Sequence, residues 1–142
     1  MLSRSLILIV LMILSGCKSN ETPDWEYVHP ELRSYYEDFL NIVGDRASKG
    51  ETVYIQFSTN LPQGVLGIAF GMNANVTHIQ INANSWLRMT EHQRRMTMYH
   101  EMAHDLLDWE HDNGTLLMVK GMPRYVDQTT INTITKELKN GW

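Results

Sequence analysis

Two histidines four residues apart, His100 and His104, with Glu101 beside the first, are the residues of this chain best suited to chemistry. On a helix, four residues turn the chain by roughly 400°, so both imidazoles project from nearly the same face. Two imidazoles placed in this way can bind one zinc ion, which prefers nitrogen and oxygen ligands in a tetrahedral site. Glu101 lies about 100° around the helix from His100 and is placed to act as a general base rather than as a ligand.

A third ligand is needed to complete the site, and two residues beyond the expected helix can provide it. His111 is the preferred ligand, and the carboxylate of Glu110 is the alternative. Three imidazoles leave a fourth position for water, which is typical of a catalytic zinc site. Zinc-binding histidines are usually oriented by a second hydrogen bond, and Asp105 is the candidate for this contact. A solvated acidic face is the alternative interpretation of Asp105 and its acidic neighbours.

The segment from His100 to His104 has the H-E-x-x-H signature of zinc-dependent peptidases. Together with His111 it resembles the metzincin pattern H-E-x-x-H-x-x-G-x-x-H, with two differences. His111 lies seven residues after His104 instead of six, and Leu107 occupies the place of the glycine at which the chain leaves the helix. We therefore expect the helix to run a little further, with the extra residue compensating. The segment is also similar to short bacterial and phage zincin-like proteins, in which an aspartate follows the second histidine, as Asp105 does here.

The resemblance implies a zinc metallopeptidase in which Glu101 takes a proton from water and later passes it to the leaving amine. Metzincins also carry a methionine-containing turn beneath the metal. Met118 is the preferred counterpart and Met122 the alternative, and ordinary core packing is equally open for both. Tyr125 follows at a spacing that does not match the family, so we interpret it as a packing residue.

The elements that must position these side chains can be predicted from periodicity and from capping residues. Thr90 and Gln93 form a capping box at the start of the site helix, and neither proline nor glycine interrupts residues 91–112. Apolar residues at helical spacing predict two further helices, and β-branched or alternating segments predict strands. The expected helices are 31–43 and 127–139, and the expected strands are 52–57, 65–70 and 77–82, with a turn at 73–75.

This order predicts an α+β domain with a short mixed sheet, the site helix and a C-terminal helix. The resemblance makes that domain zincin-like. In that family the last strand before the site helix lines the cleft and pairs with extended substrate, which here assigns that role to residues 76–84. An edge strand can hold a peptide through backbone hydrogen bonds with little demand on its sequence.

The amino terminus resembles a bacterial lipoprotein signal. Arg4 precedes an apolar run over residues 6–14, and Leu14-Ser15-Gly16-Cys17 fits the lipobox. The run is too short to span a bilayer, which needs about 20 residues. We expect residues 1–16 to be a cleaved signal peptide, Cys17 to be lipidated, residues 17–24 to form a tether, and residues 25–142 to form the domain. An uncleaved anchor and a cleaved soluble form are the alternatives.

These features predict a bacterial membrane lipoprotein on the periplasmic side. Lys18 follows the cysteine, and by resemblance to lipoproteins of enteric-type bacteria this favours the outer membrane. Removing the signal removes Arg4, which leaves eleven basic and sixteen acidic residues and a formal charge of −5. Arg88, Arg94 and Arg95 are interpreted as the solvated side of a helix, and no basic patch indicates nucleic-acid binding.

The function expected from the sequence is a membrane-anchored zinc metallopeptidase that acts on a peptide or protein substrate. One alternative is a catalytically silent zincin-fold lipoprotein that binds a protein or a cell-wall partner, because a fold alone does not determine activity. The other is a helical lipoprotein in which the motif is accidental, and this alternative predicts no tight metal binding.

Overall fold

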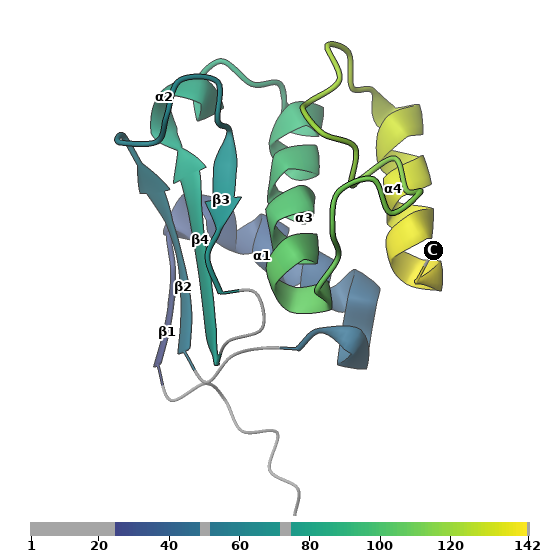
Figure 1. The fold of residues 1–142 in the computed structure, drawn as a ribbon, viewed down its shortest axis with the longest axis horizontal. Coiled ribbons are helices and arrows are strands. Elements are labelled where there is room, and N and C mark those ends of the chain that lie inside the picture. The colour runs from purple at the N-terminus through teal and green to yellow at the C-terminus, as the bar shows by residue number, and fades with distance from the viewer. Residues whose placement is uncertain (1–24, 49–51, 72–74, 142) are drawn as a thin grey trace, which may run out of the picture.

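The computed structural model describes residues 25–48, 52–71 and 75–141, which form a mixed four-stranded sheet with its helices on one side (Figure 1). The strand order is β1-β2-β4-β3, where β1, β2 and β4 are parallel and β3 runs antiparallel to β4. The strands are β1 (Trp25–Val28), β2 (Thr52–Ser58), β3 (Gly67–Ala69) and β4 (Val76–Asn82).

Three long helices lie on the same side of this sheet. Helix α3 packs on β3 and β4, α1 contacts β1 and α3, and α4 forms an outer layer against α1 and α3 (Figure 1). The helices are α1 (Pro30–Val43), the 3-10 helix η1 (Gly44–Arg46), α2 (Ala83–Trp86), α3 (Glu91–Leu107) and α4 (Gln128–Asn140). None of the helices in the described part of the chain is long and apolar enough to cross a membrane.

The core lies between the sheet and these helices. Val53 and Ile55 on β2 and Ile79 and Ile81 on β4 are fully buried, because alternate residues of a strand point to the same face. Burying one such side chain contributes about 1.5–3 kcal/mol. The apolar faces of α1, α3 and α4 close the core from the other side, with fully buried residues that include Leu32, Phe39, Tyr99, Met102, Leu106, Ile134 and Leu138.

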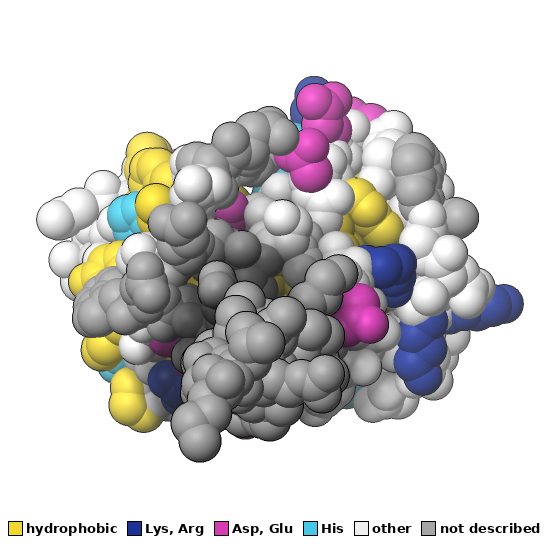
Figure 2. Space-filling view, turned by 90° about the horizontal axis from the view of Figure 1, so that it is seen from below, with side chains coloured by type: hydrophobic (Ala, Val, Ile, Leu, Met, Phe, Trp, Pro, Cys, Tyr) yellow, Lys and Arg dark blue, Asp and Glu magenta, His cyan; other side chains and the backbone are white. Residues whose placement is uncertain are grey.

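The opposite side of the sheet, here called the outer sheet face, is covered by no helix in the described residues (Figure 1). Hydrophobic side chains and a histidine are visible along this side at the left of Figure 2. Alternation and strand register place eleven residues with described side chains on it: Tyr27, Thr52, Tyr54, Gln56, Ser58, Ile68, Phe70, Val76, His78, Gln80 and Asn82.

The predicted α+β class and the mixed sheet are confirmed, and helices 31–43 and 127–139 are found to within a residue at each end. The sequence reasoning missed β1 and the short helix α2. The expected strand 65–70 contains only the three residues of β3, because Val65 N–H turns back to the carbonyl of Pro62.

One assignment is wrong. The segment 76–84 is not the edge strand, because β4 pairs with β2 on one side and with β3 on the other. Its last two residues begin α2, which the side chain of Asn82 caps by accepting the N–H of Ser85. Among the described strands, β3 is the edge on the cleft side.

Two of the three basic residues that were expected to be solvated make contacts with other side chains instead. Arg95 pairs with Asp38 at 3.0 Å, and the Arg94 guanidinium lies 5.2 Å from the centre of the Trp86 ring, while Arg88 is exposed. The signal peptide, Cys17 and the tether expected in residues 1–24 lie outside the described residues, as does most of the turn expected at 73–75.

Candidate metal centre

Helix α3 carries the site, and its first turn is defined by the capping box predicted from the sequence. The Thr90 N–H donates to Gln93 Oε1 at 2.9 Å, and the Gln93 N–H donates to Thr90 Oγ1 at 3.3 Å. Two backbone donors at the helix start are thereby satisfied. The apolar stripe of α3 packs on the sheet and on α1, which leaves the side of the helix that bears His100 and His104 facing the cleft.

The helix still includes Leu107, the place where the metzincin pattern has its glycine, and the left-handed residue that ends the helix comes one position later. Leu107 is still helical, and Asp108 adopts a left-handed conformation with φ 56° and ψ 36°. Aspartate is among the few non-glycine residues that adopt this conformation readily. The Trp109 N–H then donates to the Ala103 carbonyl at 3.1 Å, and the chain reverses along the helix. The seven-residue spacing from His104 thus leaves room for the last helical residues and the turn before His111.

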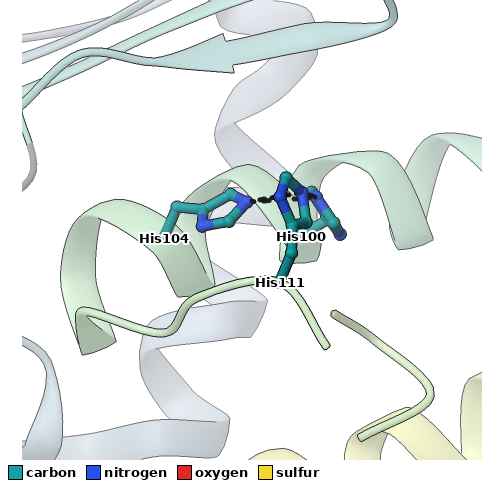
Figure 3. Close-up of side chains that lie close together, drawn as sticks. All are labelled: His100, His104 and His111. Carbon is teal, nitrogen blue, oxygen red and sulfur yellow. Dashed lines mark hydrogen bonds between the residues drawn. The ribbon is translucent and has the colours of Figure 1, made fainter. Parts of the chain in front are cut away.

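The reversal brings the three histidines together (Figure 3). The Nε2 atoms are 3.2 Å apart for His100 and His104, 3.0 Å for His100 and His111, and 3.1 Å for His104 and His111. A tetrahedral zinc ion with Zn–N bonds of about 2.1 Å holds its nitrogens about 3.4 Å apart. The observed triangle is close to this size, so the three histidines could hold a metal ion.

The second nitrogen of each helical histidine contacts a backbone carbonyl. His100 Nδ1 lies 2.7 Å from the Leu117 oxygen, and His104 Nδ1 lies 2.6 Å from the Trp109 oxygen. A carbonyl only accepts, so each Nδ1 must donate its proton. In the neutral imidazole the Nε2 of both residues then carries a lone pair, and the two lone pairs face each other at 3.2 Å. A cation at the centre of the triangle relieves this repulsion, which is a physical reason for the fit.

Burial keeps these imidazoles neutral. It lowers the pKa of His100 to about 4, with smaller effects from the neighbouring histidines, and it also lowers the pKa of His104. Neutral imidazole is the form that binds metals, so neither residue has to lose a proton at neutral pH before it can act as a ligand. His111 is exposed and completes the triangle from the loop.

Glu101 comes from the same helix as His100 and His104, and its carboxyl group lies against β3, at the wall of the cleft. Its side chain is 8% exposed, and it forms a hydrogen bond with the backbone of Ala69 on β3. Burial raises its pKa to about 7, and the nearby Asp105 carboxylate adds to this rise, while the Ala69 contact opposes it. A carboxyl group with such a pKa can both take up and release a proton near neutrality.

Gly67 provides the space for this carboxylate. A Cβ atom at position 67 would lie 2.7 Å from Glu101 Cγ and 2.9 Å from Glu101 Oε1. Both distances are shorter than normal van der Waals contact, so any other residue at position 67 forces Glu101 to move. Glycine on the edge strand therefore allows the carboxylate to lie against the backbone of β3.

The cleft that contains these groups has a volume of about 760 Å³. One wall is the segment 64–69, which includes β3, and the floor is α3 from Met96 to His104. The other wall contains Glu110, His111 and residues 120–122. A cleft of this size accommodates a short stretch of peptide or a small molecule.

The loop between His111 and α4 is held by contacts that stabilise the Leu117 carbonyl. The Asp112 N–H donates to the Met118 carbonyl at 2.9 Å and closes the loop. Glu137, on α4, accepts the N–H groups of Leu116 at 2.8 Å and of Leu117 at 3.1 Å. The C-terminal helix is thereby linked to His100 through a single backbone segment.

The remaining predicted site residues have the following places. Asp105 is buried, and its Oδ2 accepts the backbone N–H of His78 on β4 at 2.9 Å, so the orienting contacts expected from it are made instead by two carbonyls. Met118 is fully buried, while Met122 lines the cleft. Glu110 also lines the cleft but does not belong to the group of potential ligands.

Tyr125 is 77% exposed, so its interpretation as a packing residue is wrong. The sequence reasoning also missed Gly67, Leu117, Trp109 and Glu137. A glycine inside a predicted strand is a weak signal of close approach by another group. Backbone carbonyls leave no signal in the sequence, because every residue has one.

No family model matches the chain, and no curated protein or solved structure is significantly similar to it.

Proposed function

We propose that this chain is a zinc-dependent metallopeptidase of zincin-like fold, anchored to a membrane through Cys17. The observation that carries the proposal is the triangle of Nε2 atoms from His100, His104 and His111, with Glu101 in the same cleft. Nitrogen ligands at these separations favour zinc over harder cations, which prefer oxygen. Three protein ligands leave a coordination position for water or substrate.

Different groups of the chain have different roles in the proposed hydrolysis. Zinc, when bound, polarises the scissile carbonyl and lowers the pKa of a water molecule. The Leu117 and Trp109 carbonyls hold the two helical imidazoles in the tautomer that presents Nε2 to the ion. Glu101 accepts a proton from the attacking water and donates it to the leaving amine, and its position against β3 keeps it apart from the histidines.

The edge of β3 that borders the cleft supports an extended peptide as substrate. Phe70 N–H donates to the His78 carbonyl and Asn82 N–H donates to the Leu66 carbonyl, so the even-numbered residues of this segment pair with β4. The backbone groups of Gly67 and Ala69 therefore point toward the cleft. A peptide added to this edge as a further strand would be held mainly through its backbone and would pass beside Glu101.

The anchor and the location are proposed from the sequence alone, because residues 1–24 lie outside the described residues. The proposed lipid on Cys17 would hold the domain at the periplasmic side of a bacterial membrane, with the outer membrane favoured by Lys18. Multiple acyl chains hold a protein at a membrane firmly, whereas a single chain does not. The substrate would then be a periplasmic protein or a peptide of the cell wall.

The decisive experiment measures metal content and cleavage in the full-length protein purified in detergent. We expect one zinc per chain, lost on His104→Ala and retained on His92→Ala, a matched histidine on the same helix that does not belong to the triangle. Glu101→Gln should keep zinc and lose cleavage of an unstructured protein substrate. A protein without stoichiometric zinc refutes the metal centre. Stoichiometric zinc without cleavage refutes the peptidase and supports a zincin-fold binding protein.

A further inference from the structure

The outer sheet face carries a continuous row of aromatic rings, one from each strand or its immediate end. Tyr27 and Tyr54 are register partners with ring centres 5.4 Å apart, and Tyr54 and His78 are partners at 5.3 Å. Phe70, directly after β3, stacks on His78 at 4.8 Å. The row crosses the whole sheet on the side that no described helix covers.

This row is accessible and surrounded by uncharged side chains. Phe70 is 53% exposed, Val76 41% and Tyr27 39%, which makes them three of the most exposed large hydrophobic residues among the described positions. A hollow lies over Tyr27, Tyr54 and His78. The eleven residues of the outer sheet face include no Lys, Arg, Asp or Glu, although these types make up 20% of the chain. A solvated sheet face usually carries such charges, and an apolar, aromatic face usually has a partner.

The position of the row relative to the amino terminus indicates the partner. Tyr27 lies in β1, the first described strand, and the register places Tyr54 and His78 beside it, near the amino-terminal ends of their strands. Residues 18–24, seven in number, separate Cys17 from Trp25. The eight Cα–Cα steps from Cys17 to Trp25 span at most about 29 Å when fully extended. An anchor at Cys17 therefore confines this end of the sheet to the region next to the lipid headgroups.

We propose that the outer sheet face docks on the surface of the lipid bilayer that holds the anchor. The inference rests on the lipidation of Cys17 proposed above, and it is independent of zinc. Tyrosine side chains are enriched at the membrane interface, where the ring lies among apolar groups and the hydroxyl remains in water. The absence of acidic side chains on the face removes repulsion from anionic lipids. The cleft lies on the helix side of the sheet, so docking leaves it open to substrate.

The test uses the full-length lipidated chain in vesicles of phosphatidylethanolamine with a minor fraction of phosphatidylglycerol. Cys17 is the only cysteine, so after lipidation an introduced cysteine is the only free thiol. Thr52→Cys places a polarity-sensitive fluorophore in the hollow of the outer sheet face, and Thr133→Cys places the same label on the exposed side of α4 as a control. We expect a blue-shifted emission that lipid-borne quenchers suppress for the label at 52, and water-like, unquenched emission at 133.

A second variant tests whether the aromatic row itself causes the shielding. Tyr27→Ser combined with Phe70→Ser should restore water-like emission at position 52 without changing the zinc content. Equal emission at positions 52 and 133, with lipid on Cys17 verified by mass spectrometry, overturns the proposal. So does an unmodified Cys17. Shielding at position 52 that persists in dilute detergent and resists lipid quenchers assigns the face to a second copy of the chain and also overturns it. Zinc measured in the same samples tests the metal centre separately.

Discussion

Glu137 offers the sharpest test of how the fold positions the metal ligands. This residue touches none of the three histidines, yet its carboxylate holds the Leu116 and Leu117 N–H groups at 2.8 and 3.1 Å, and the Leu117 carbonyl accepts from His100 Nδ1. Glu137→Ala removes both contacts and frees the carbonyl to move. Hydrogen bonds to a charged group contribute about 1.5–3 kcal/mol each.

The expected consequence is weaker zinc binding in a protein that still folds. Removing a group that orders a ligand from outside the coordination sphere typically costs about 10–100-fold in metal affinity. Glu137 acts on His100 only through the Leu117 backbone, so Glu137→Ala should raise the zinc dissociation constant by about 10-fold, the lower end of this range, and Glu137→Gln, which keeps one acceptor oxygen, should have a smaller effect. Competition with a fluorescent zinc chelator measures the affinity, and circular dichroism verifies that the variants are folded.

The control separates positioning from general loss of stability. Asp127 caps the same helix by accepting the Thr130 N–H at 2.8 Å, and its side-chain hydrogen bonds go to Thr130 and not to the Leu116–Leu117 segment. Asp127→Ala should lower the free energy of unfolding of the protein without weakening zinc binding. If the Asp127 and Glu137 variants lose zinc affinity to the same extent, Glu137 acts only through the stability of α4 and the reasoning is refuted.

Three further outcomes follow from the site. In the metal-free protein, Glu101 keeps its proton up to about pH 7 when folded but only to about 4.5 when unfolded, so the free energy of unfolding falls as pH rises through this window. Glu101→Gln removes this titration. Its free energy of unfolding, relative to that of the unaltered protein, should therefore increase by up to about 3 kcal/mol between pH 4.5 and pH 8. Urea unfolding at both ends of that range measures this, and a pH-independent offset would contradict it. Gly67→Ala should displace Glu101 and reduce peptide cleavage while zinc content stays the same, and a fully active variant would show that the close approach has no role. Removing zinc with a chelator should lower the melting temperature. The stabilisation lost is about 4 kcal/mol when free zinc was at about 1,000 times its dissociation constant. His104→Ala should show no such chelator effect.

Local sequence patterns were enough to predict the helix and its two histidines. The capping box at Thr90 and Gln93, the uninterrupted run that follows and the four-residue spacing of His100 and His104 all depend on contacts within a few residues. Such contacts are the same in any fold that contains the helix. The place of the Asp108 turn could also be predicted approximately, because the missing glycine and the late third histidine together indicated a slightly longer helix.

The partner of the Asp105 side chain could not be predicted from its neighbours in the sequence. Asp105 neighbours His104 in the sequence, but adjacent residues of a helix point about 100° apart. Its carboxylate therefore reaches β4 instead of the histidine, and the ligands are oriented by carbonyls from the chain beyond the helix. The interpretation of Tyr125 as a packing residue is wrong for a related reason. The course of an irregular loop decides which of its side chains are exposed.

By itself the sequence determined the helix, its two metal-facing imidazoles, the neighbouring carboxylate and the presence of a third histidine at a usable distance. Only the tertiary structure decided that β3 rather than β4 borders the cleft, that Gly67 makes room for Glu101, and that Glu137 holds the segment whose carbonyl orients His100. Gly67 and Glu101 are 34 positions apart in the chain, and Glu137 is 21 and 20 positions from Leu116 and Leu117. The strand order and the packing of α3 and α4 determine these contacts, and neither is encoded in the residues next to the site.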